Sequence, residues 1–168
     1  MTRIRIIDSS LLILLDQYNG LEKFCKECKD KKIRVVTSPE VFEETVIKPR
    51  KLARYRDSAD KIAYIVFDSR VVQVEKVLYD AFISKITDRA RALISQRSGM
   101  PKHTIERADL EIIGLAFMHL AQGDKPEVIF RDRAMMHALA MLAARYDRDG
   151  KIEIINALHY LRDMKIIR

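Results

Sequence analysis

Tryptophan is absent from this chain, and glycine (5), proline (4) and cysteine (2) are scarce. So few glycines and prolines argue against long disordered linkers. No apolar run approaches the roughly 20 residues that a membrane-spanning helix needs, and the longest covers residues 11–15. The first residues lack the apolar region and small-residue cleavage site of a signal peptide. We therefore expect a cytoplasmic protein with no membrane association.

Metal-binding and catalytic motifs of several common kinds are also missing. The two cysteines form one CxxC, Cys25 to Cys28, with no second pair, and the histidines are scattered, so a four-ligand zinc site is excluded. The CxxC falls inside a predicted helix, which favours a structural role over a redox role. The chain has neither a GxGxxG nor a GxxxxGK[ST] loop, and no Ser-His-Asp arrangement can be placed.

The remaining composition is that of one soluble globular domain covering residues 1–168, with 48% hydrophobic and 33% charged residues. The net charge of +7 and pI of about 9.5 favour an acidic partner, nucleic acid above all. A generally basic proteome is the alternative explanation. A basic cluster at residues 48–56 is either an RNA-contacting arm or a solvated helix face.

Hydrophobic spacing predicts strands that alternate with helices along most of the chain. The strands are expected at residues 4–7, 33–37, 71–74, 128–130 and 152–155. The helices are expected at residues 10–15, 21–29, from Ser38-Pro39 to Pro49, 51–67, 76–97, from a Thr104 cap to Gly123, 134–146 and 157–163. This alternation predicts the α/β class, with a parallel sheet and helices on both of its faces.

Four acidic residues fall where a parallel sheet would bring them together. Asp8 and Asp132 follow predicted strands, and Glu44 and Asp109 lie on predicted helices that can face the same edge. A desolvated carboxylate needs a partner, and oxygen ligands suit Mg²⁺ or Mn²⁺ better than zinc. A bound metal would lower the pKa of a water and stabilise charge on an attacked phosphate.

Each acidic residue also has a simpler reading when taken alone. Asp8 and Asp132 could cap the helices that follow them, and Asp109 could simply favour a helix N-terminus. Glu44 could be a surface residue, with Glu43 or Glu40 in its place. His137 follows Asp132 on the next predicted helix and is read as a packed or surface histidine. The coincidence of all four carboxylates at matching edges favours a metal site.

These motifs, in this order, resemble the PIN domain, a family of metal-dependent ribonucleases that includes VapC-type toxins. The resemblance rests on a strand ending in Asp-Ser, a Ser-Pro helix start leading to Glu, an Asp in an Ala- and Leu-rich helix, a strand followed by x-Asp-Arg, and a closing strand and helix. These motifs are Ile6–Ser10, Ser38–Glu44, Ala108–Ala116, Val128–Arg133 and Gly150–Leu161. Together they span essentially the whole chain.

The resemblance implies a three-layer α/β/α sandwich around a parallel sheet of about 4–5 strands. It implies Mg²⁺ or Mn²⁺ bound by the catalytic residues Asp8, Glu44, Asp109 and Asp132, with Glu43 as the alternative to Glu44. Ser9, Arg131 and Arg133 are candidate contacts to RNA. Family members often form homodimers, and toxin members are inhibited by an antitoxin protein that covers the acidic site.

Three functions are compatible with this resemblance. The first is a metal-dependent endoribonuclease that cleaves single-stranded RNA as the toxin of a type II toxin–antitoxin pair. The second is a PIN-type nuclease in ribosomal RNA processing. The third is an inactive PIN-fold module that binds RNA or protein. The third is suggested by Phe130, because the family often has Ser or Thr two residues before the fourth Asp.

Overall fold

The computed structural model describes residues 2–168 and contains a five-stranded parallel sheet in the order β3-β2-β1-β4-β5. The strands are β1 (Arg3–Ile7), β2 (Arg34–Thr37), β3 (Val72–Val74), β4 (Lys125–Phe130) and β5 (Glu153–Asn156). The α-helices are α1 (Ser9–Gln17), α2 (Leu21–Asp30), α3 (Pro39–Phe42), α4 (Lys48–Arg50), α5 (Arg56–Ile62), α6 (Ala81–Ser98), α7 (Arg107–Ala121), α8 (Arg133–Tyr146) and α9 (Ala157–Asp163). Shorter 3-10 and π segments are η1 (Glu43–Ile47), η2 (Ala53–Tyr55), η3 (Ala63–Asp68) and η4 (Lys102–Thr104).

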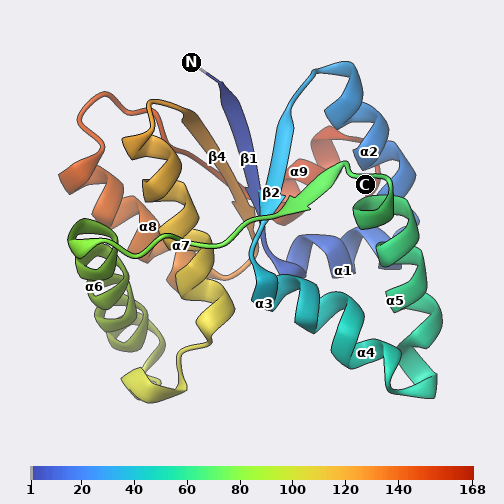
Figure 1. Ribbon diagram of the computed structural model, residues 1–168, viewed down its shortest axis with the longest axis horizontal. Coiled ribbons are helices and arrows are strands. Elements are labelled where there is room, and N and C mark those ends of the chain that lie inside the picture. The colour runs from blue at the N-terminus through green and yellow to red at the C-terminus, as the bar shows by residue number, and fades with distance from the viewer. Residues whose placement is uncertain (1) are drawn as a thin grey trace.

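Helices cover both faces of this sheet, as predicted. In Figure 1, α6, α7 and α8 lie on the left of the strands, and α1, α2, α5 and α9 lie on the right. The central strands are apolar and fully buried, with Ile4, Ile6 and Ile7 in β1 and Val128 and Ile129 in β4 all 0% exposed. Continuous apolar runs of this kind are typical of parallel strands that are buried on both faces. The sandwich expected from the sequence is therefore confirmed.

A buried ion-pair network joins β1 to β4, α2 and α9. Arg5 Nε donates to Glu127 Oε1 at 2.7 Å, and Arg5 Nη1 donates to Glu27 Oε2 at 2.5 Å and to the Tyr160 hydroxyl at 3.2 Å. Arg5 and Glu127 are each 2% exposed and lie opposite each other in the register of β1 and β4. A charge desolvated to this extent is stable only while its partners remain.

Three predicted helix boundaries were wrong. Pro49 does not end its helix but lies within α4, after the π segment η1, whose wider turn reduces the clash between the proline ring and the carbonyl four residues earlier. Thr104 does not cap α7, because its hydroxyl bonds the Pro101 carbonyl at 2.7 Å, and Glu106 takes the cap position. Helix α6 begins at Ala81, after the Asp80 cap, rather than at residue 76.

The segment of residues 75–80 explains the late start of α6. It crosses α7 as an extended chain, seen as the long thread before α6 in Figure 1. A Cβ placed on Gly114 of α7 would lie only 3.0 Å from a Val77 methyl group, and the Leu78 N–H points at the Met118 sulfur at 3.5 Å. These close contacts with α7 hold the segment out of the helix. Residues 51–67, predicted as one helix, are divided among η2, α5 and η3.

Two further expectations concern the cysteines and the membrane. Cys25 and Cys28 are buried on α2 at 6% and 1% exposure, and burial raises the pKa of both thiols, which opposes thiolate chemistry. Their position agrees with a structural role. Within residues 2–168, no helix is both long and apolar enough to cross a bilayer.

Replacing Glu127 with Gln should lower the free energy of unfolding by about 3 kcal/mol, because the buried Arg5 guanidinium loses a charged partner while side-chain volume is kept. Chemical denaturation measures the loss. The control is Lys26→Ala, which removes an exposed i,i+4 pair with Asp30 worth roughly 0.5 kcal/mol. Equal losses in the two variants would contradict a structural role for the network.

Candidate acidic active site

Asp8 lies at the carboxyl end of β1, where it also caps helix α1. Its Oδ1 atom accepts a hydrogen bond from the Ser10 hydroxyl at 2.6 Å and from the Leu11 N–H at 3.4 Å. The residue is 6% exposed. Burial raises the pKa of Asp8 to about 6, against the opposing effect of the Ser10 and Leu11 hydrogen bonds, and the nearby charge of Glu44 raises it further. Asp8 can therefore cap helix α1 and also belong to an acidic site.

Asp132 reaches the same edge from the neighbouring strand. The register pairs Ile7 of β1 with Ile129 of β4, so that the two strands end side by side. Asp132 follows β4 as the N-cap of α8, and its Oδ1 accepts the Met135 N–H at 2.9 Å. Asp132 is exposed to solvent. Because one carboxylate oxygen is used in the cap, the other is free to face outward from the edge.

Asp109 lies in the first turn of α7 and faces the other carboxylates. Its pKa is raised to about 7, first by burial and then by the charges of Glu106, Asp8, Asp132 and Glu44. Four separate acidic side chains therefore act on this one carboxyl group. Such crowding indicates that the acidic residues of β1, β4, α7 and η1 point toward a common space.

Glu44 is held in η1, the π-helical turn that continues α3. Burial raises the pKa of Glu44, the nearby Ser9 hydroxyl lowers it, and the charge of Glu106 raises it again. The Glu44 charge acts on both Asp8 and Asp109. Glu44 is not among the residues that line the hollow described next, and the choice between Glu44 and Glu43 stays a prediction.

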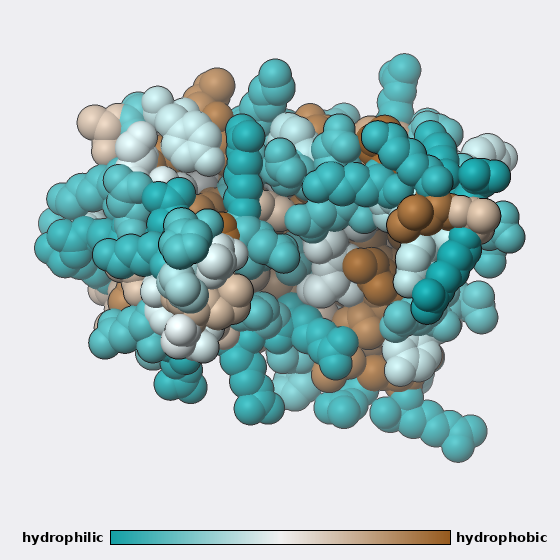
Figure 2. Space-filling view, turned by 90° about the horizontal axis from the view of Figure 1, so that it is seen from below, coloured by the Kyte–Doolittle hydropathy of each residue, from teal (hydrophilic) through white to brown (hydrophobic). Residues whose placement is uncertain are grey.

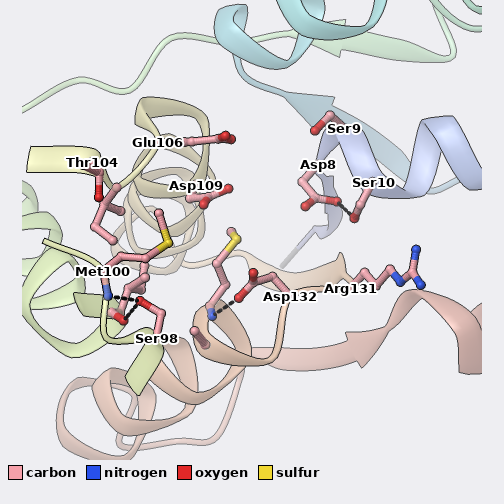
Figure 3. Close-up of a pocket in the computed structure, with 14 residues that line it drawn as sticks. Asp8, Ser9, Ser10, Ser98, Met100, Thr104, Glu106, Asp109, Arg131 and Asp132 are labelled. Atoms are coloured by element: carbon pink, nitrogen blue, oxygen red, sulfur yellow. Dashed lines mark hydrogen bonds between the residues drawn. The ribbon is translucent and has the colours of Figure 1, made fainter. Parts of the chain in front are cut away.

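A hollow of about 490 Å³ lies between these elements. Figure 3 shows Asp8, Asp109, Asp132 and Glu106 pointing toward one shared space from different elements. The remaining lining side chains come from α1, α6, η4 and α8, and they are Ser9, Ser10, Ile94, Ser98, Met100, Thr104, Ile105, Arg131, Ala134 and Met135. Figure 2 looks onto this edge of the molecule from below and shows largely hydrophilic atoms, with hydrophobic atoms gathered on the side of α1 and α4.

Glu106 was missed by the sequence analysis. It is exposed, caps α7, lines the hollow and raises the pKa of Asp109 more than any other charged neighbour. Its signal in the sequence is the Glu-x-x-Asp spacing, which places two acidic side chains on one face of a helix. The wrong assignment of the cap to Thr104 hid it, because that assignment put the helix start two residues too early.

The other predicted residues fall at different distances from the hollow. Ser9 and Arg131 line it, although Figure 3 shows Arg131 extending away from the carboxylates. Arg133 is exposed on α8, and His137 is half-buried farther along the same helix, outside the lining. Phe130 is 0% exposed and belongs to the core. Its lack of a hydroxyl therefore changes the core at the end of β4 rather than the lining of the hollow.

The chemistry of the donors fits a hard divalent cation. Every ionisable acidic group that lines the hollow is a carboxyl, and neither Cys nor His is among the lining residues. Across residues 2–168 no three acidic, His or Cys side chains are positioned at once for metal coordination. The mutual repulsion that raises the pKa of Asp109 is, however, what a divalent cation would remove.

The comparison with known families agrees with this arrangement. A family model described as "Halobacterial PIN domain" matches residues 1–166. The chain belongs to the PIN-domain family. PIN domains have a nuclease-type fold, are generally nucleases and typically use divalent metals. No curated protein matches the chain. The PIN resemblance seen in the sequence motifs is thus confirmed over almost the whole chain, whereas the VapC-type role stays a prediction.

Asp8→Asn should stabilise the metal-free protein at pH 8. The pKa of Asp8 is about 6 in the folded protein and 3.8 ordinarily. The ionised carboxylate therefore destabilises the fold increasingly as the pH rises from the lower to the higher value, and fully above it. Asn keeps the cap and removes the charge, and the gain should approach about 2–3 kcal/mol at pH 8 and shrink toward pH 4. Thermal unfolding in EDTA measures it.

The control for that measurement is Asp149→Asn, which removes a carboxylate whose side chain is 78% exposed in a surface turn. Its effect on stability should be small at every pH between 4 and 8. A destabilised Asp8→Asn protein at pH 8 would contradict the charge crowding described above.

Proposed function

We propose that this PIN-domain protein is a metal-dependent endoribonuclease that cleaves single-stranded RNA. The catalytic and metal-binding residues we propose are Asp8, Glu44, Asp109 and Asp132. The observation that carries the proposal is the convergence of Asp8, Asp109 and Asp132 on one hollow of about 490 Å³, where burial and nearby acidic charges raise the pKa of Asp109. A fold that tolerates such repulsion at one edge is expected to use it for a cation.

The chain's own groups would prepare this site for phosphodiester hydrolysis. Bound Mg²⁺ or Mn²⁺ would supply an activated water and stabilise negative charge on the phosphate. Asp8 is held by the Ser10 hydroxyl and Asp132 by the Met135 N–H, so both carboxylates are oriented before any ligand arrives. The carboxyl group of Asp109 is partly protonated between pH 6 and 8, because its pKa is about 7.

Recognition of RNA would rest on phosphate contacts around this acidic centre. The net charge of +7 favours a polyanion, and Arg131 lies at the rim of the hollow. Arg133 on α8 and the basic residues of α4 and α5 are exposed. Positive charge around a carboxylate-lined hollow steers the polymer while leaving the centre for a cation.

Within this activity, we propose the role of a VapC-like toxin that acts as a homodimer and is bound by an antitoxin protein. The support is the open acidic hollow, into which an arginine of a partner could reach to pair with the carboxylates. A role in ribosomal RNA processing is the alternative, and a small antitoxin gene beside this one would favour the toxin.

Labelled single-stranded RNA should be cut in Mn²⁺ or Mg²⁺ and left intact in EDTA, because the carboxylates alone cannot activate water. Asp8→Asn and Asp132→Asn should each lower the cleavage rate by about a hundredfold or more, whereas Asp149→Asn should cut like the parent. Gel electrophoresis of the products measures this. Metal-independent cutting, or full activity in Asp8→Asn, would contradict the proposed site.

Millimolar Mn²⁺ should raise the melting temperature of the parent protein by roughly 5–10 °C if it is present at about 100 times its dissociation constant. Asp109→Asn should lose most of that rise, because the central carboxylate of the cluster is gone. Differential scanning fluorimetry gives both values. An unchanged melting temperature in the parent would favour an inactive binding module instead.

A further inference from the structure

A second hollow adjoins the acidic one on the side of α6 and α7. Its volume is about 550 Å³, and Ile105 lines both hollows. The remaining lining residues are Tyr79, Ser84, Thr87, Asp88, Arg91, Arg107 and Leu110. No residue predicted as functional from the sequence lies among them, so this surface is additional to the site described above.

The two hollows lie along the same side of helix α6. Ser84, Thr87 and Arg91 line the second hollow, and Ile94 and Ser98 line the first. These positions recur every three or four residues and therefore lie on one side of the helix. From Ser84 to Ser98 the helix rises about 20 Å. That length exceeds one nucleotide, so a strand of several nucleotides lying along this side of α6 would contact both hollows.

The charge changes sign across the first turn of α7. Glu106 and Asp109 face the acidic hollow, whereas Arg107 and Leu110 face the second one. Arg107 pairs with Glu111 at 3.2 Å and lies 3.8 Å from Glu40, yet its side chain is 75% exposed, so guanidinium N–H groups remain open to solvent. Glu106 and Asp109 thus contribute carboxylates to the first hollow, and the second is lined by two arginines together with the exposed Asp88.

An aromatic side chain completes the second hollow. Tyr79 is 52% exposed, and its segment is fixed against α7 by the Val77 and Leu78 contacts. Burial and the Glu111 charge raise the pKa of Tyr79, while Arg107 and Arg91 lower it, so both guanidinium groups act on the same hydroxyl. Arg91 itself makes only a 3.4 Å contact with the exposed carboxylate of Asp88.

We propose that this second hollow, defined by Tyr79, Arg91 and Arg107, is a subsite for the RNA nucleotide next to the cleaved bond. The two arginines would contact its phosphate, and its base would stack on the Tyr79 ring. A fixed aromatic ring costs little entropy on binding, so the subsite is preorganised. This inference rests on the proposed ribonuclease function, whose metal and scissile phosphate would lie in the acidic hollow.

The test is equilibrium binding of a fluorescein-labelled single-stranded RNA, measured by anisotropy in EDTA at several salt concentrations. Tyr79→Leu should raise the dissociation constant about fivefold or more without changing its salt dependence. Arg91→Gln should also raise it and should reduce the slope of log K against log salt by about 0.7. Both side chains are partly or largely exposed, and circular dichroism verifies that the variants fold.

The matched control is Arg89→Gln, which removes one positive charge from the side of α6 that faces α8. Its dissociation constant should stay within about twofold of the parent value. If Tyr79→Leu and Arg91→Gln bind RNA like the parent, the subsite is overturned and the nuclease proposal stands. If Arg91→Gln and Arg89→Gln weaken binding equally while Tyr79→Leu binds like the parent, binding is general electrostatic attraction, and the subsite is likewise overturned.

Failure of the proposed ribonuclease function would give different results from failure of the subsite. Because binding is read in EDTA, a parent that binds RNA but never cuts it with Mn²⁺ would overturn the nuclease while Tyr79→Leu still tests the subsite. A parent that neither binds nor cuts single-stranded RNA would overturn both. In an active parent, Tyr79→Leu should raise KM at least fivefold with kcat unchanged, the pattern expected for lost substrate binding.

Discussion

The parallel pairing of β1 with β4 is the constraint on which the rest of this structure depends. Residues far apart in the chain end at the same level because Ile7 lies opposite Ile129. Each strand is followed by a turn that begins a helix, and the cap of that helix is Asp8 directly after β1 and Asp132 two residues after β4. Asp8 and Asp132 are therefore positioned by backbone geometry, and α7 and η1 bring further carboxylates against them.

The middle of this strand pair and its carboxyl end differ in how their charged groups are paired. Around Arg5, buried charges are matched by Glu127 and Glu27 and joined by a tyrosine hydroxyl. At the carboxyl end of the pair, burial together with nearby carboxylates of like charge raises the pKa of Asp8 and of Asp109. Around Arg5 the paired charges compensate one another, and removing one partner would leave a buried charge unpaired. At the carboxyl end the repulsion between carboxylates remains, and a divalent cation would neutralise it.

Much of this could be predicted from local patterns. Buried strands in a parallel sheet are short apolar runs, and Ser38-Pro39 is a strong helix start, so the order of elements and the sheet type followed from the residues. The errors occurred where a particular contact overrides a local preference. Leu78 has helical spacing with Phe82, but the packing of Val77 against Gly114 and the contact of the Leu78 N–H with Met118 hold the segment extended. Thr104 has good capping chemistry that is already used by the Pro101 carbonyl.

The sequence by itself determined the α/β order, the family and three aspartates at the ends of strands and at a helix start, because these features depend on neighbours within a few residues. Only the tertiary structure decided that Glu106 joins the acidic hollow and that Tyr79 and Arg91 share a second hollow. Those facts depend on how α6 and α7 pack. No periodic pattern in a sequence shows which side chains of separate helices lie close together.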